Sequence, residues 1–139
     1  MIILDTNVLS ELMRPRPDPA VVGWMASQPA SSLYTTSITQ AEILHGIMIL
    51  TAGRRRSALE TATAAMFAED FDGRILGFGT DSAAPYARIA ADRRRARRPI
   101  SHFDAQIAAI AHTVGAAIAT RNLSDFQDLG LRLVDPWAT

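Results

Sequence analysis

The sequence predicts an α/β fold in which a central parallel β-sheet of about five strands is flanked by helices. Short apolar runs alternate with longer stretches of helical periodicity. The first run is apolar without interruption, as in a strand buried on both faces, and signals for tight hairpins are few. With 139 residues, 48% of them apolar, the chain is long enough for a single domain, residues 1–139, and too short for two.

The N-terminal part is predicted to contain one strand and two short helices. Ile2 to Leu4 are the strand, and apolar residues at helical spacing between Val8 and Met13 predict a helix directly after it. Asp5 lies between them. It is explained either as the cap of that helix or as a ligand-binding acid, because ligands of open α/β sheets bind at the carboxyl ends of strands. After a proline-rich turn, Asp18 and Pro19 begin the second helix.

The middle of the chain is predicted to hold two strands and two helices. The strand from Leu33 to Thr36 leads into a helix whose apolar residues recur at helical spacing, namely Ile38, Ala41, Leu44 and Met48. A longer helix runs from about Ser57 to Glu69. The segment from Arg74 to Phe78 is a short third strand, weakened by two glycines.

Two more helices are predicted before the last strands. The first has Thr80 or Asp81 as its cap and stops before Pro99. The second is capped by Ser101, is ended by Gly115, and carries the apolar stripe Phe103, Ile107, Ile110 and Val114. The runs "AAIAT" and "LRLVD" are the fourth and fifth strands. Helices between the strands favour a parallel sheet.

The composition excludes several kinds of site. The absence of cysteine excludes disulfides and thiolate metal sites, and His45, His102 and His112 lack the spacing of a zinc site. No apolar run reaches a membrane-spanning length, and no basic segment precedes the first one. We therefore expect no transmembrane helix, no signal peptide and no membrane partner, and a cytoplasmic location.

Four acidic residues are predicted near strand ends or helix starts: Asp5, Glu42, Asp104 and Asp125. Each has a structural alternative. Glu42 follows Thr39 by three residues, as in a capping box, and Asp104 lies in a first helical turn, where the helix dipole favours an acid. Together, however, they predict several carboxylates on one rim of the sheet. Such carboxylates repel one another, and a hard divalent cation, Mg²⁺ or Mn²⁺, relieves that repulsion.

All fourteen basic residues are arginines, and the formal net charge is zero. They cluster at "RRR" (54–56) and at "RRRARR" (93–98). Guanidinium groups suit phosphate oxygens, so such clusters can contact a nucleic-acid backbone. The alternative is a solvated helix face, which charge runs often are.

The chain resembles PIN-domain proteins, and among them the VapC and FitB-like toxins of bacterial toxin–antitoxin pairs. The matching motifs are "MIILDTNVLSEL", "TTSITQAEILHGI", "RPISHFDAQIAAIA", "GAAIATRNLSDF" and "DPW", which cover almost the whole length. The resemblance implies a PIN-like fold with the first strand in the centre, beside the fourth. It also implies a metal-dependent endoribonuclease that cleaves RNA phosphodiester bonds with Mg²⁺ or Mn²⁺.

The resemblance also assigns candidate catalytic and metal-binding residues. Asp5 and Asp104 match the main metal-binding acids, and Glu42 matches the third member of the cluster. Thr6, Asn7 and Thr120 match supporting residues. Many PIN domains have an aspartate where this chain has Asn122, so either Asp125 supplies the fourth charge or Asn122 binds metal through its amide oxygen. One or two bound ions are both compatible with this set.

The resemblance implies an RNA substrate, a cognate antitoxin, a homodimer, and a heteromer with the antitoxin that binds operator DNA. Five arginines are candidate contacts for RNA or for an acidic antitoxin segment: Arg93, Arg94, Arg95, Arg97 and Arg98. The alternative function is a weakly active or inactive PIN-domain partner of a DNA-binding antitoxin, acting mainly in operator repression. A phosphoaspartate enzyme is disfavoured, because the chain has no lysine and has Asn7 where a second acid is expected.

Overall fold

The computed structural model describes residues 1–139 and contains one parallel sheet with the strand order β3-β2-β1-β4-β5. The strands are β1 (Ile2–Leu4), β2 (Leu33–Thr36), β3 (Ile75–Leu76), β4 (Ala117–Ala119) and β5 (Leu133–Val134). Each lies within the stretch predicted for it, so the predicted fold class is confirmed. Leu4 pairs with Ala119, and the carboxyl ends of β1 and β4 are therefore neighbours at the middle of the sheet.

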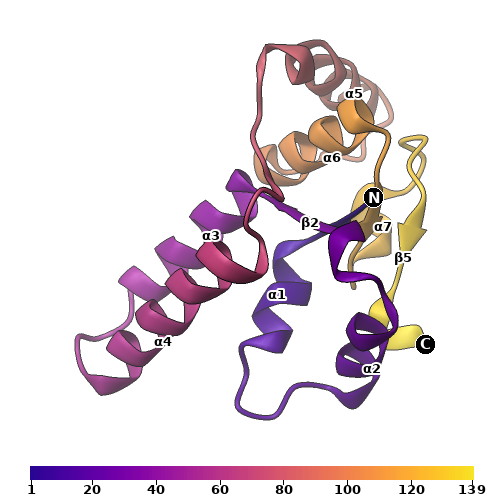
Figure 1. The fold of residues 1–139 in the computed structure, drawn as a ribbon. Coiled ribbons are helices and arrows are strands. Elements are labelled where there is room, and N and C mark those ends of the chain that lie inside the picture. The colour runs from indigo at the N-terminus through magenta and orange to yellow at the C-terminus, as the bar shows by residue number, and fades with distance from the viewer.

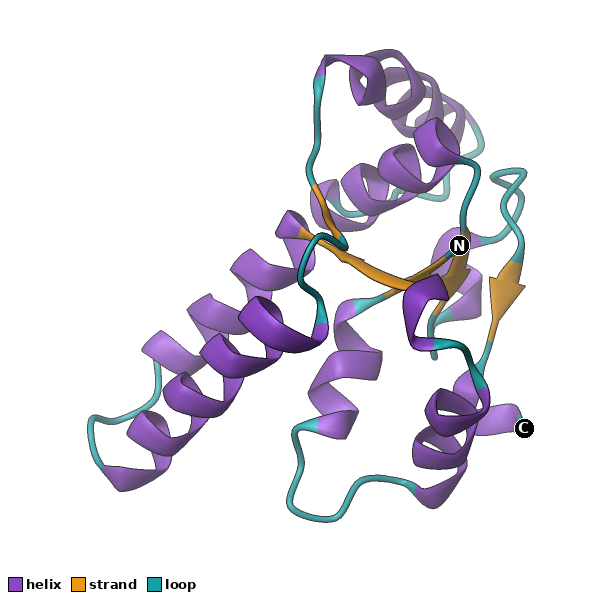
Figure 2. Cartoon of the chain, viewed as in Figure 1, coloured by secondary structure: helices purple, strands orange, loops and turns teal.

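Helices cover the sheet (Figure 1, Figure 2). They are α1 (Thr6–Leu12), α2 (Pro19–Ser27), α3 (Ser37–Met48), α4 (Arg54–Ala65), α5 (Ala83–Arg95), α6 (His102–Val114) and α7 (Leu123–Phe126). A π-helical turn (Met66–Asp70) continues α4, and short 3-10 turns occupy Ala30–Ser32, Thr80–Ser82 and Pro136–Ala138. α3 and α4 run side by side and project from the rest of the molecule (Figure 1). None of the helices has the length and apolar character that a membrane span requires.

Alternate residues of the central strands belong to two different hydrophobic cores. Ile3 and Ile118 lie in the core that contains α6, whereas Leu4 and Ala119 lie in the core that contains α1 and α2. All four side chains are fully buried. The first strand is therefore apolar without interruption because both of its faces are covered.

The apolar stripe that predicts α3 is not the buried face of this helix. Its buried residues are Thr39, Ile43 and Ile47. Leu44 is 40% exposed and Met48 is 64% exposed. The helical periodicity is correct, but the choice of face is decided by the neighbours of α3.

The prediction that Thr80 or Asp81 caps α5 is wrong. Both belong to a 3-10 turn that precedes the helix, and the N-cap is Ser82, which makes no capping hydrogen bond with its side chain. The Ser82 hydroxyl lies 3.0 Å from the Thr113 hydroxyl oxygen on α6. A tertiary contact therefore takes the place of a local cap at this helix start.

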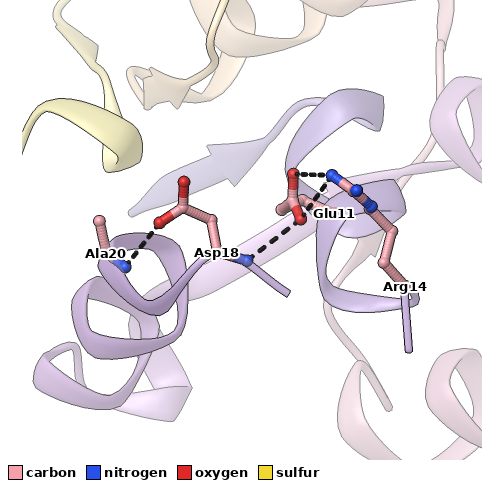
Figure 3. A network of polar contacts seen from close by, with 4 residues as sticks. All are labelled: Glu11, Arg14, Asp18 and Ala20. Atoms are coloured by element: carbon pink, nitrogen blue, oxygen red, sulfur yellow. Dashed lines mark hydrogen bonds and ion pairs between the residues drawn. The ribbon is translucent and has the colours of Figure 1, made fainter. Parts of the chain in front are cut away.

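A buried glutamate organises the connection between α1 and α2 (Figure 3). Glu11 is 6% exposed, and its carboxylate accepts hydrogen bonds from Arg14 Nη1 at 3.2 and 3.3 Å and from the Asp18 backbone N–H at 3.2 Å. Asp18 in turn caps α2 by accepting from the Ala20 N–H at 2.9 Å, as the sequence predicts. Glu11 thus links the end of one helix to the cap of the next.

Candidate active site

Asp5 lies where β1 ends and α1 begins, and it is 5% exposed. Its Oδ1 accepts a hydrogen bond from the Thr6 backbone N–H at 2.8 Å, which makes Asp5 the N-cap of α1. Its Oδ2 accepts from Thr120 Oγ1 at 2.9 Å and from Asn7 Nδ2 at 3.3 Å. One oxygen therefore caps the helix, while the other is held by a residue that directly follows β4.

The capping-box explanation of Glu42 is wrong. Thr36 caps α3, with its Oγ1 accepting from the Thr39 N–H at 3.1 Å, so Glu42 lies in the second helical turn. Its Oε1 accepts a hydrogen bond from Thr6 Oγ1 at 2.9 Å. Thr6 therefore binds two acids, Asp5 through its N–H and Glu42 through its hydroxyl.

The predicted supporting residues form a connected network around Asp5. Asn7 Nδ2 donates to Thr120 Oγ1 at 3.2 Å, and Asn7 Oδ1 accepts from the Arg121 N–H at 3.2 Å. Thr120 Oγ1 also accepts from the Asn122 N–H at 3.0 Å. Asn122 takes part in this network through its backbone, and the residue is exposed.

Asp104 and Asp125 reach the site from two further helices. Asp104 is half-buried in the first turn of α6, and its backbone N–H donates to Oγ of the N-cap Ser101 at 3.1 Å. Asp125 lies in α7, a single helical turn after β4 that was not expected from the sequence. The charge of Asp125 acts on both Asp5 and Asp104, so these acids lie within electrostatic reach of one another.

The acids share one electrostatic environment. Burial raises the pKa of Asp5 against the opposing hydrogen bond from Thr120, and the charges of Glu42 and Asp125 raise it further. Burial and then the charge of Asp5 raise the pKa of Asp104 from 3.8 to about 6. Burial and the charge of Asp104 also raise the pKa of Glu42. The site is therefore a concentration of negative charge in a partly desolvated place.

The oxygen atoms available as metal ligands at this site suit a hydrated divalent cation. Carboxylate, hydroxyl and amide oxygens are the ligands that Mg²⁺ and Mn²⁺ prefer. No group of three or more Asp, Glu, His or Cys side chains is arranged to hold an ion. Mg²⁺, however, usually keeps several waters and takes only one or two carboxylates, so three converging ligands are not required. The chemistry of the donor set thus fits a cation that retains part of its water shell.

A cleft of about 520 Å³ adjoins Glu42, which is the one member of the four acids that lines it. Thr6 and Glu42 line one part of it, and Arg14 and Arg55 line another, between α1, α3 and α4. A larger cavity of about 790 Å³ lies between α1, α2 and the π-helical turn, and none of the four acids lines it.

The arginine run does not form one exposed patch. Two of its members pair with aspartates, Arg95 with Asp92 at 3.3 Å and Arg98 with Asp128 at 2.8 Å. Arg94 and Arg97 are exposed and make no ion pair. Arg93 is only 6% exposed and donates to backbone carbonyls, which places it inside the fold.

Thr39 also belongs to this site, although it was not among the predicted site residues. Thr39 is fully buried, and its Oγ1 lies 3.1 Å from Thr6 Oγ1. The sequence feature that could have indicated Thr39 is its position three residues before Glu42, because this spacing places both residues on one face of the helix.

The sequence model of the PIN domain family matches residues 2–130 of this chain. The VapC ribonuclease Y4jK of Sinorhizobium fredii is 37% identical over 99% of this chain and 98% of its own length. The toxin FitB of Neisseria gonorrhoeae is 35% identical over 99% of both chains. A solved structure of FitAB bound to an IR36 DNA fragment has a TM-score of 0.92 and 35% identity over 99% of this chain and 96% of that chain. By these matches over almost its whole length, the chain belongs to the PIN domain family, and within it to the VapC and FitB-like toxins.

Proposed function

We propose that this toxin is a metal-dependent endoribonuclease that cleaves RNA phosphodiester bonds at the site formed by Asp5, Glu42 and Asp104. The observation that carries the proposal is that these acids lie close enough for their charges to interact. The charge of Glu42 raises the pKa of Asp5, that of Asp5 raises the pKa of Asp104, and that of Asp104 raises the pKa of Glu42. Three segments of the chain thus bring negative charge together. A divalent cation between them offsets that repulsion.

In this proposal Asp5 and Asp104 hold Mg²⁺ or Mn²⁺, with Asp125 as the fourth acid. Asp125 is favoured over Asn122 because its charge acts on both Asp5 and Asp104, whereas the hydrogen bond of Asn122 to the network is made by its backbone. When bound, the ion supplies positive charge to the phosphoryl oxygens and activates the attacking water.

The residues of the chain orient the acids for this reaction. Thr6 fixes the carboxylate of Glu42, which is thereby placed to orient a water molecule or to accept its proton. Thr120 and Asn7 fix the Oδ2 atom of Asp5. All three hydrogen-bond donors are neutral, so they orient the carboxylates without cancelling the negative charge that attracts a cation.

We also propose that the toxin pairs with a cognate antitoxin, that it forms a homodimer, and that the heteromer binds operator DNA. Membership of the family and the FitAB structure solved with a DNA fragment support this. Residues 1–139 are then a single PIN domain, because both hydrophobic cores share β1 and β4.

The test of the cleavage proposal is RNA digestion by the purified protein. We expect Asp5→Asn and Asp104→Asn to abolish cleavage in Mg²⁺ or Mn²⁺ while circular dichroism stays unchanged. Asp72→Asn changes an exposed aspartate outside the site in the same way and serves as the control. If the Asp5→Asn protein degrades RNA as fast as the parent, the assigned site is wrong. A parent that represses its operator with the antitoxin but never cleaves RNA would favour the alternative function.

A further inference from the structure

Arg93 is a buried cation that makes no ion pair, although its charge acts to lower the pKa of Asp104. It is 6% exposed, and none of the four ion pairs in the structure includes it. Moving a charged group out of water is costly unless hydrogen bonds or opposite charges compensate. The fold must therefore supply that compensation to Arg93.

Backbone carbonyls accept hydrogen bonds from this guanidinium group. Arg93 Nη2 donates to the carbonyl oxygens of Asp125 at 2.8 Å and of Gln127 at 2.9 Å, and Nη1 donates to that of Arg98 at 3.5 Å. The Nε atom is buried and has no partner. The two shorter bonds thus join the last turn of α5 to the segment around the end of α7, which lies 32 and 34 residues later in the chain.

α7 depends on such contacts for its position. It is a four-residue helix, and a helix of this length is not stable by itself. Its last carbonyls have no intrahelical partners, and a cation near them is favourable. Phe126 anchors the turn through a side chain that is 1% exposed, and Arg93 anchors it through the backbone.

We propose that Arg93 is a positioning residue that holds Asp125 against the other acids and so completes the cation site, an inference that rests on the proposed function. The carbonyl of Asp125 that Arg93 binds and the carboxylate that serves the site belong to one residue. The carboxylate of Asp125 acts on Asp5 and Asp104. If α7 moves, the carboxylate of Asp125 moves with it, and the set of side chains available to bind the cation changes.

The sign of the effect distinguishes this role from a purely electrostatic one. A guanidinium near the acids repels a divalent cation, so removal of its charge alone would tighten cation binding. Loss of the anchor for Asp125 would weaken it. A merely structural role would lower the stability of the fold and leave the affinity of the folded protein unchanged.

The experiment measures the affinity of the full chain for Mn²⁺ alone by calorimetry. We expect Arg93→Met to weaken Mn²⁺ binding by about tenfold or more, the scale seen for residues that orient metal ligands. Arg88→Met is the matched control, because Arg88 is an exposed arginine on the same helix with no hydrogen bond or ion pair. Its Mn²⁺ affinity should equal that of the parent.

A second pair of variants tests whether Arg93 acts through Asp125. If it does, Arg93→Met combined with Asp125→Asn binds Mn²⁺ no more weakly than Asp125→Asn alone. Arg93→Lys keeps the charge without the planar fork and gives the same comparison if Arg93→Met does not fold.

Equal or tighter Mn²⁺ binding by the folded Arg93 variant, or losses that simply add in the double variant, would overturn the inference. Unchanged Mn²⁺ binding by Asp5→Asn would instead overturn the proposed function. A parent that binds no Mn²⁺ overturns both.

Discussion

Neutral groups make the hydrogen bonds that fix the carboxylates of Asp5 and Glu42. Thr6 binds one oxygen of each, and Thr120 holds the second oxygen of Asp5. Neutral donors orient a carboxylate but do not remove its charge. The orientation of these acids is thus settled in the folded chain, while their charges continue to repel one another, as the proposed cation site requires.

Among single residues, Asp104 has a raised pKa that predicts how the free energy of unfolding depends on pH. Its pKa of about 6 lies above the unfolded value near 3.8, so the folded state holds this proton more tightly. The free energy of unfolding without metal should therefore fall as the pH rises from the unfolded value to the folded one, and stay lower above it.

Asp104→Asn removes this titration. We expect the variant to have a higher thermal midpoint than the parent at pH 7 in a chelator, and a similar midpoint at pH 4, where Asp104 is largely protonated in the folded state. Melting curves at the two pH values check this, with Asp72→Asn as the comparison. A midpoint below that of the parent at pH 7 would contradict the prediction.

Among the elements, the junction of α1 and α2 depends on one buried side chain. Glu11→Ala removes the acceptor for Arg14 and leaves the Asp18 N–H without its partner. We expect the free energy of unfolding to fall by about 1–3 kcal/mol, the usual cost of an unsatisfied buried polar group. Urea titration measures the change. Glu60→Ala, which removes a half-exposed partner of Arg56, should change stability by less than about 0.5 kcal/mol.

Two glycines on opposite faces of the sheet should respond to alanine in opposite directions. Gly115 ends α6 with a φ of +69°, in the left-handed region, whereas Gly23 lies inside α2 with open space where a Cβ would lie. We expect Gly115→Ala to destabilise the protein by about 1 kcal/mol, because alanine disfavours that backbone conformation. Gly23→Ala should stabilise it by about 0.5–1 kcal/mol through helix propensity. Thermal unfolding of both variants distinguishes the signs, and equal shifts would refute the argument.

In the whole molecule, the order of the strands is what gathers the acids. β1 lies between β2 and β4, so the segments after these three strands meet at one rim. Asp5 follows β1, Glu42 lies on the helix after β2, and Asp125 lies in the turn after β4. This is the place in an open parallel sheet where ligands bind.

The same arrangement predicts that a divalent ion stabilises the entire fold. An ion that binds only the folded state adds about 2.7 kcal/mol at a concentration of one hundred times its Kd. We expect Mn²⁺ to raise the thermal midpoint of the parent, a chelator to reverse the rise, and Asp5→Asn to show no rise. A Mn²⁺-dependent shift of equal size in Asp5→Asn would place the ion elsewhere.

Much of the molecule was open to prediction from the order of residues alone. Apolar runs and helical periodicity locate all five strands and the helices α1 to α6, because these signals arise within a few neighbouring residues. The position of Asp5 after a buried strand, together with the family motifs, identifies the acids as candidates. The catalytic and metal-binding roles of these acids stay predictions.

The remaining features depend on contacts between distant segments. α7 is too short to carry a periodic signal, and the burial of Arg93 follows from carbonyls more than thirty residues away. The partner of Glu42 is Thr6, 36 residues earlier, and not the nearby Thr39 that a capping box requires. The sequence by itself determined the alternation of strands and helices and the positions of the acidic residues along the chain, since both depend on neighbouring residues only. Only the tertiary structure decided which polar groups meet, because that depends on the order in which the strands pair.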